Sequence, residues 1–248
     1  FKQKTAYEIS TRDWSSDVCS SDLYILTNES YRSLVLEQLP ELSNEQVICE
    51  PERKNTAPCI AFAAAKILSK NADATLLISP SDHLIVNTTR FTQIIETAIL
   101  EANKNQLVTL GIKPTRPDTG YGYIEVSADN NQPGSVKQVE QFREKPSLEL
   151  AKSFVEAGNY FWNSGIFIWR ADVILHAMKE HAFDLHHLFA GNLSKYNTQD
   201  ESEFMRASFA ASKDISIDFA VMEHASNVSV VLADFDWSDL GKIGRAHV

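Results

Sequence analysis

Two acidic residues follow apolar, strand-like runs at distant points of the chain, in the segments LLISPSDHLI and VVLADFDWSDLG. Asp82 comes after a proline-stiffened turn, and Asp239 lies in a predicted turn that ends at a glycine. Two carboxylates from two strand ends, together with substrate phosphates, form a donor set that suits Mg²⁺. Asp234 and Asp236 are alternatives to Asp239. A helix cap or a surface charge would explain each acid taken alone, and His83 fits a packed or solvent-edge imidazole better than a ligand.

A second group of residues is suited to a phosphorylated sugar. Glu144 and Lys145 are adjacent in QFREKP, so we expect them to point to different sides of a strand end. The carboxylate can accept from sugar hydroxyls while the lysine reaches a phosphate. Gly122 lets the backbone approach a ligand closely, and Asn163 is the polar group at the mouth of an apolar strand. A surface ion pair, a glycine turn and a turn-forming Asn are the ordinary explanations.

The loop EPERKNTAPCI lies between a predicted strand and a predicted helix. Thr56 can serve as the N-cap of that helix, with Pro58 in its first turn. The functional alternative is that the backbone and Asn55 read the edge of a nucleobase, with local positive charge from Arg53 and Lys54. Both interpretations stay open at this stage.

The elements that must position these residues alternate between strand and helix in the first half of the chain. Apolar runs predict strands at 24–28, 46–50, 74–79 and 107–112, and helical patterns lie between them at 30–39, 57–68 and 91–103. This order predicts a three-layer α/β domain with a mixed, mostly parallel sheet.

After Lys113 we expect antiparallel strands to extend the sheet, at 120–126, 136–142 and 164–169. Helices are expected at 147–157, 171–181 and 217–223, and a further strand at 228–235. Ligands of open α/β sheets bind beyond the carboxyl ends of the strands. No linker-like segment interrupts the pattern, which predicts a single domain.

Composition excludes several classes of function. The net charge is −10 and no block of Lys and Arg exists, so nucleic acid is not an expected partner. No apolar run approaches the roughly 20 residues that span a bilayer. Cys49 and Cys59 lie in apolar surroundings, which predicts reduced cysteines of a cytoplasmic protein.

The two ends of the chain follow no hydrophobic pattern. Residues 2–9 and 13–23 resemble in-frame translations of short-read sequencing adapters, and residues 243–248 resemble the partner adapter. We therefore expect residues 1–23 and 242–248 to be adapter-derived and to lie outside the fold. Residues 24–241 are then the native part, cut at both ends.

Taken in order, the segments of the chain resemble the mannose-1-phosphate guanylyltransferases, or GDP-mannose pyrophosphorylases, of the sugar-nucleotidyltransferase superfamily. The matching segments are EPERKNTAP, SPSDHLI, GIKPTRPDTGYGYIE, FREKP, NSGIFIW, SIDFAVME and DWSDLG. The Asn-Thr-Ala-Pro loop and the Pro-x-Asp-His segment point to the mannose and guanine branch. The resemblance implies a Rossmann-like nucleotide-diphospho-sugar transferase fold. It also implies the reaction of GTP with α-D-mannose 1-phosphate to GDP-mannose and diphosphate, with Mg²⁺.

The resemblance also implies a role for each matching residue. Catalytic residues would be Asp82, Lys145 and Asp239, of which the two aspartates would hold the metal. The sugar phosphate would be bound by Gly122, Glu144, Lys145 and Asn163, and the guanine by Asn55 and Thr56.

The chain departs from the family at its ends. The Gly-rich loop and first strand of the family are absent from residues 1–23, so we expect the fragment itself to be inactive. The family's C-terminal β-rich region or fused isomerase domain is also absent.

Another hexose-1-phosphate nucleotidyltransferase and a non-catalytic nucleotide-sugar-binding regulatory paralogue are the alternative functions. Self-association into a homo-oligomer stays open.

Overall fold

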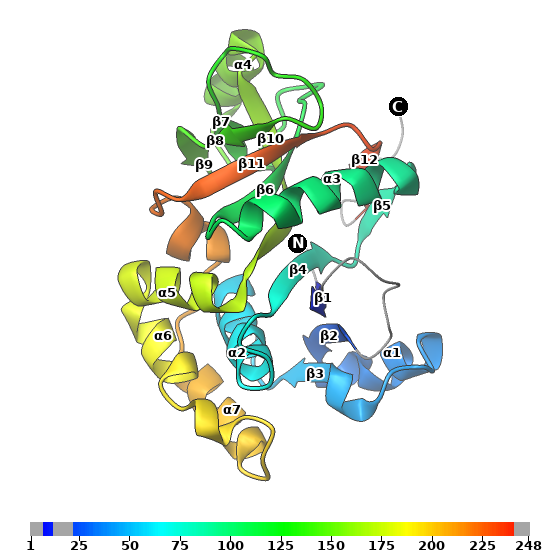
Figure 1. Ribbon diagram of the computed structural model, residues 1–248, viewed down its shortest axis with the longest axis vertical. Helices are drawn as coiled ribbons and strands as arrows, with labels where there is room; N and C mark the ends of the chain where they lie inside the picture. Colours follow the sequence, from blue (N-terminus) through cyan, green and yellow to red (C-terminus); the bar gives the residue numbers. More distant parts are fainter. Residues whose placement is uncertain (1–6, 12–21, 241–248) are drawn as a thin grey trace. The chain divides into compact units, whose positions relative to one another are not determined.

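The computed structural model describes residues 7–11 and 22–240, in a Rossmann-like α/β fold with a mixed sheet (Figure 1). The described residues divide into two compact units, where the sequence predicts a single domain. Unit 1 comprises residues 82–168 and 226–240, and unit 2 comprises residues 7–11, 22–81 and 169–225.

Unit 1 is built on strands that pair around β6 and β11. Its elements are β5 (His83–Ile85), α3 (Thr88–Ala102), β6 (Leu107–Ile112), β7 (Tyr123–Glu125), β8 (Val136–Gln138), β9 (Gln141–Arg143), α4 (Leu148–Ala157), β10 (Tyr160–Arg170, up to residue 168), β11 (Val228–Ala233) and β12 (Trp237–Asp239). β6 pairs with β11 in parallel and with β10 antiparallel, and β5 and β12 form a separate two-stranded sheet.

Helix α3 covers β6 and β11 because its apolar residues recur with helical spacing (Figure 1). Its buried stripe consists of Ile94, Ile95, Ala98, Ile99 and Ala102. Helix α4 is capped at both ends. Ser147 accepts a hydrogen bond from the backbone N–H of Leu150, and Gly158 closes the helix in the left-handed region with φ of 78°.

Unit 2 is packed around the buried helix α2. Its elements are β1 (Tyr7–Thr11), β2 (Leu23–Asn28), α1 (Arg32–Gln38), β3 (Val47–Glu50), α2 (Thr56–Leu68), β4 (Thr75–Pro80), α5 (Ala171–His181), α6 (Phe183–Ala190), α7 (Glu201–Ala211) and a π-helical turn at Asp218–Met222. Every residue from 57 to 67 is buried, and the small alanines of α2 let α5 and α6 pack against it. No helix within the described ranges is long and apolar enough to cross a membrane.

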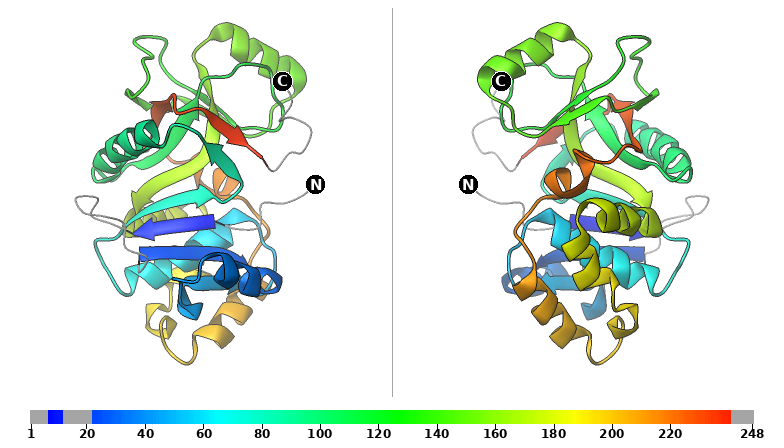
Figure 2. Two further views of the ribbon diagram at one scale, coloured as in Figure 1. Left: turned by 90° about the vertical axis from the view of Figure 1, so that its right-hand side faces the viewer. Right: turned by 90° about the vertical axis from the view of Figure 1, so that its left-hand side faces the viewer.

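The expectation that residues 1–23 lie outside the fold is wrong for Tyr7–Thr11. These residues form β1, which lies between β2 and β4 and is antiparallel to both (Figure 2). The physical reason is that ladder hydrogen bonds join main-chain groups, so an extended segment rich in Tyr, Ile and Thr can pair with two open strand edges. Leu23 of the same segment is the first residue of β2, so the expectation is wrong there too. The expectation for residues 1–6, 12–21 and 242–248 falls outside the described residues.

The prediction that parallel pairing predominates is also wrong. Parallel pairs join β2 to β3 and β6 to β11. Antiparallel pairs join β1 to β2 and β4, β10 to β6 and β7, β7 to β9, and β8 to β11. Parallel pairing of successive strands needs a long crossover, usually a helix, and no helix lies between β6, β7, β8 and β9. The predicted strand at 136–142 is two strands, β8 and β9, and helices α6 and α7 were not predicted.

Candidate active site

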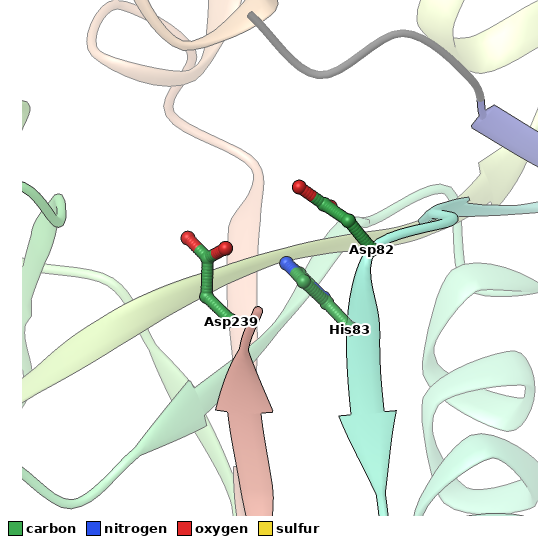
Figure 3. A group of neighbouring side chains, drawn as sticks. All are labelled: Asp82, His83 and Asp239. Carbon is green, nitrogen blue, oxygen red and sulfur yellow. The ribbon is translucent and has the colours of Figure 1, made fainter. Parts of the chain in front are cut away.

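Asp82, His83 and Asp239 form one cluster in unit 1, although Asp239 lies far from the other two in sequence. Their ligand atoms all lie within 4.8 Å of one another. Figure 3 shows the three side chains converging, with the imidazole between the carboxylates. Asp239 is 9% exposed. The predicted convergence of the two aspartates is therefore present in the structure, while their role as metal ligands stays a prediction.

The β5–β12 ribbon positions this cluster. Asp239 pairs with His83 in the antiparallel register, and the N–H of Leu240 donates to the carbonyl of Asp82 at 2.9 Å. The turn predicted around Asp239 is wrong, because Trp237–Asp239 is a strand. The pairing of β5 with β12 brings the two acids together. The apolar runs of the sequence do not predict this pairing.

His83 is held in place by the indole of Trp237. Trp237 Nε1–H donates to His83 Nδ1 at 3.1 Å, and the two rings meet edge to face with centroids 5.1 Å apart. An indole nitrogen only donates, so Nδ1 acts as an acceptor and the proton of the neutral imidazole is on Nε2. Sequence reasoning left His83 out of the site; its place directly after Asp82 was the available signal.

The donors of this cluster fit a hard divalent cation. Mg²⁺ takes oxygen ligands and is commonly held by one or two carboxylates plus substrate phosphates. Asp82 and Asp239 supply those carboxylates, whereas the Nε2–H of His83 is a hydrogen-bond donor. Of the alternatives, Asp234 binds Arg90 instead, with Oδ1 at 2.7 Å from Nε.

Gly122, Glu144 and Asn163 form a second cluster in unit 1. A Cβ added to Gly122 would lie 2.5 Å from Glu144 Oε2 and 3.4 Å from Asn163 Cβ. The N–H of Asn163 donates to the carbonyl of Gly122 at 2.8 Å. Asn163 is 8% exposed, and its Oδ1 accepts from Thr109 Oγ1 at 2.8 Å and from Gly165 N–H at 3.2 Å. The three predicted sugar-binding residues thus lie together.

Lys145 and Glu144 do not point to different sides, so that expectation is wrong. Lys145 Nζ lies 2.9 Å from Glu144 Oε1, and the side chain of Lys145 is 62% exposed while that of Glu144 is 9% exposed. Lys145 has a left-handed backbone with φ of 47°, which interrupts the alternation of a strand. The cation and the carboxylate therefore pair with each other.

Asn55 and Thr56 belong to unit 2. Asn55 is the N-cap of α2, with φ of 66°, and its Oδ1 accepts from the N–H of Thr56 at 3.0 Å. Thr56 Oγ1 accepts from the N–H of Ile217 at 2.8 Å, and the N–H of Ala57 donates to Ile215 at 3.1 Å. The cap is thus Asn55, with Thr56 as the first helical residue. The loop is tied to the SIDFAVME segment.

Comparison with known proteins identifies the family. Residues 16–245 match the family model described as nucleotidyl transferase. The chain belongs to the nucleotidyl transferase family. It is 41% identical over 223 residues to the mannose-1-phosphate guanylyltransferase of Sinorhizobium fredii. This alignment covers 88% of this chain and 43% of that protein. It is 40% identical over 233 residues to the protein of the same name from Escherichia coli, covering 90% and 48%.

Solved structures agree with this placement of the nucleotidyl transferase chain. A structure from Thermus thermophilus, described as a mannose-1-phosphate geranyltransferase, aligns with a TM-score of 0.75 at 28% identity, over 87% of this chain and 60% of that one. A structure from Helicobacter pylori, described as a mannose-6-phosphate isomerase, aligns with a TM-score of 0.71 at 31% identity, over 86% and 83%. The chain spans less than half the length of the two curated relatives above.

Proposed function

We propose that the protein is a mannose-1-phosphate guanylyltransferase, which converts GTP and α-D-mannose 1-phosphate into GDP-mannose and diphosphate. The observation that carries the proposal is the meeting of Asp82 and Asp239 on the β5–β12 ribbon. The names of the curated relatives support the choice of sugar and nucleotide. The two buried cysteines, both free thiols, are compatible with a cytoplasmic enzyme.

The chemistry requires positioning and charge neutralisation more than covalent help from the protein. An oxygen of mannose 1-phosphate attacks the α-phosphorus of GTP, and the bond to the bridging oxygen breaks as diphosphate leaves. No general base is required, because a sugar phosphate is already ionised at neutral pH. Asp82 and Asp239 would hold Mg²⁺, which neutralises phosphate charge when it is bound.

The remaining residues orient the two substrates. Lys145 leaves its ion pair with Glu144 to bind the sugar phosphate, and Glu144 then accepts from mannose hydroxyls beside Gly122 and Asn163. The Nε2–H of His83 donates to a phosphate oxygen. In unit 2, Asn55 and Thr56 bind the guanine through the loop that caps α2.

The proposal is tested by measuring diphosphate release from purified protein with mannose 1-phosphate and GTP, ATP, UTP or dTTP in turn. We expect GTP to be used at least about tenfold better than the others, a difference of about 1.4 kcal/mol. A preference for UTP or dTTP with glucose 1-phosphate would instead indicate another hexose-1-phosphate nucleotidyltransferase. Binding of GDP-mannose without diphosphate release would indicate a non-catalytic paralogue.

A variant of Lys145 tests the sugar side of the same proposal. Lys145→Ala should raise the KM for mannose 1-phosphate far more than the KM for GTP, because it removes a phosphate contact and nothing at the base. Lys152→Ala, at an exposed lysine of α4, is the matched control and should change neither value. A rise in the KM for GTP alone would contradict the role given to Lys145.

A further inference from the structure

The loop at residues 113–122, which joins β6 to β7, contains a buried carboxylate. The side chain of Asp118 is 3% exposed. Its Oδ1 accepts from the N–H of Gly120 at 2.9 Å, and its Oδ2 lies 3.0 Å from Nη2 and 3.2 Å from Nε of Arg116. Both oxygens therefore accept hydrogen bonds from within the loop, so the carboxylate holds the loop together instead of facing a substrate.

The hydrogen bond to Gly120 gives the loop its shape. An Asp that accepts from the N–H two residues ahead closes an Asx turn, in which a side chain fixes the backbone. The side chain of Arg116 is 48% exposed, so solvent weakens its attraction to the carboxylate. The N–H of Asp118 donates to the hydroxyl of Tyr123 at 3.0 Å, and Tyr123 is fully buried at the start of β7. Asp118 thus ties the loop to the core of unit 1 as well as to its own glycine.

The two residues that follow this turn contact the two clusters of the proposed site. The ring of Tyr121 lies 5.3 Å from that of Trp237, measured between centroids. Trp237 in turn donates to His83, which forms the metal cluster with the two aspartates. The carbonyl of Gly122 accepts from the N–H of Asn163 in the sugar-binding cluster at 2.8 Å. Adjacent residues of one loop therefore reach both clusters.

The orientation of Trp237 depends on aromatic residues of this loop. Trp237 packs against a buried cluster that includes Tyr121, Tyr123 and Trp162. Tyr121 is 8% exposed, and its ring also lies 5.1 Å from that of Trp162. Because such interiors are close-packed, a shift of the Tyr121 ring is transmitted to the indole. The indole N–H would then lose its alignment with Nδ1 of His83.

We infer that Asp118 is a positioning residue that acts through Tyr121 and Gly122. By closing the turn, it fixes the ring that supports Trp237 and the carbonyl that meets Asn163. One buried carboxylate thereby holds the metal cluster and the sugar-binding cluster in register. The effect on turnover rests on the proposed function, whereas the effect on the metal cluster does not.

Nuclear magnetic resonance of the ¹⁵N-labelled histidine and tryptophan side chains provides a test without substrate. At about pH 8.5 an ordinary imidazole is neutral, and we expect His83 to carry its proton on Nε2 because Trp237 donates to Nδ1. Asp118→Ala should produce a mixture of tautomers at His83 and shift the indole N–H signal of Trp237. The two signals are identified by their loss in His83→Gln and Trp237→Phe.

Conservative variants separate the turn from the charge, and they decide the question even if Asp118→Ala fails to fold. Asp118→Asn keeps an oxygen for the N–H of Gly120 but loses the charge that binds Arg116, so His83 should retain a single tautomer. Asp118→Glu keeps the charge, but its extra methylene prevents the turn from closing, so the mixture should appear.

A change at Tyr121 tests the route by which Asp118 acts. Tyr121→Leu should produce the tautomer mixture at His83 while Asp118 stays in place. Adding Asp118→Ala to Tyr121→Leu should not increase the mixture further, because two changes along one route are not additive. A further increase of the same size as in Asp118→Ala alone would contradict this route.

Asp172→Ala is the matched control. Asp172 also pairs with an arginine two residues earlier, with Oδ1 at 3.0 Å from Nε and Oδ2 at 2.9 Å from Nη2 of Arg170. Its Oδ1 likewise accepts a backbone N–H, from Val173 at 3.0 Å, but it belongs to unit 2 and is half-exposed. The control should leave the His83 signals and the kinetics unchanged.

Kinetics test the consequence for the proposed reaction. Asp118→Ala should lower kcat/KM for mannose 1-phosphate about 100-fold, because a misplacement of about 1 Å has an effect of that size. The KM for GTP should change far less, since the residues proposed to bind the base belong to unit 2.

A single tautomer at His83 in Asp118→Ala or Asp118→Glu, with only a loss of thermal stability, would overturn the inference. A mixture in Asp118→Asn but not in Asp118→Glu would also overturn it, because the charge and not the turn would then be responsible. If the tautomers respond as expected but the unaltered protein releases no diphosphate from GTP and mannose 1-phosphate, the proposed function alone is contradicted.

Discussion

Replacing Gly122 with alanine should impair the sugar side of the site with little effect on folding. The added Cβ would lie 2.5 Å from Glu144 Oε2, whereas ordinary contacts begin at 3.4 Å. The carboxylate must therefore move by about 1 Å, and a misplacement of that size can reduce turnover about 10²-fold. A factor of 10² corresponds to about 2.7 kcal/mol. We expect this loss in kcat/KM for mannose 1-phosphate.

The free energy of unfolding should stay within about 1 kcal/mol in Gly122→Ala. The clashing atom is the far end of a flexible side chain, whose partner Lys145 is exposed, so moving it costs little. The backbone at Gly122 is not in the left-handed region, and alanine lowers the entropy of the unfolded chain.

Gly158→Ala is the matched control, because it should lower stability and leave the kinetics unchanged. An added Cβ there meets nothing within 4 Å, but φ is +78°. The variant should lose about 1–2 kcal/mol of stability and keep its KM for mannose 1-phosphate. Urea unfolding and steady-state kinetics of both variants check these values. Unchanged kcat/KM in Gly122→Ala would refute the assignment of this cluster to the sugar.

Three further predictions concern the metal cluster and a buried acid. Asp239→Asn should weaken Mn²⁺ binding at least about tenfold, as measured by electron paramagnetic resonance of free Mn²⁺. Trp237→Phe should leave Mn²⁺ affinity nearly unchanged but produce a tautomer mixture at His83 in ¹⁵N spectra, because Nδ1 loses its donor. Burial raises the pKa of Glu50 from 4.5 to about 7, partly offset by a hydrogen bond to Cys59. The unfolded carboxyl ionises first, so the free energy of unfolding should fall by up to about 3 kcal/mol between about pH 4.5 and pH 7. Glu50→Gln should remove this fall in urea titrations, and an unchanged slope would contradict the assignment.

The sequence predicted best the elements with a regular burial pattern, which is a continuous buried run in β6 and one buried face in α5. The strand predicted at 107–112 is β6, and the helix predicted at 171–181 is α5, with the same bounds. Both are strongly patterned because burial leaves few acceptable residue types. Strands β8 and β9 are only three residues long each and partly exposed, so the run at 136–142 does not reveal where one ends.

The sequence predicted which residues belong to the site better than it predicted the contacts that hold them together. The segment motifs selected Asp82 and Asp239 correctly as residues that meet. The ribbon that joins them depends on main-chain pairing, which leaves no side-chain signature. The contact between Trp237 and His83 likewise links distant segments, so neither residue could be assigned a partner from local spacing.

In the structure, Glu144 and Lys145 of the proposed substrate site form an ion pair with each other. Because the lysine is 62% exposed, the pair contributes no more than about 1 kcal/mol to stability. A substrate phosphate carries more negative charge than one carboxylate and can take Lys145 from Glu144 at little cost. The hydroxyls of the same substrate then donate to the largely buried carboxylate in place of the lysine. Under the proposed function, one binding event therefore satisfies both residues, and a substrate without the phosphate would leave Glu144 paired with Lys145 and closed to the sugar.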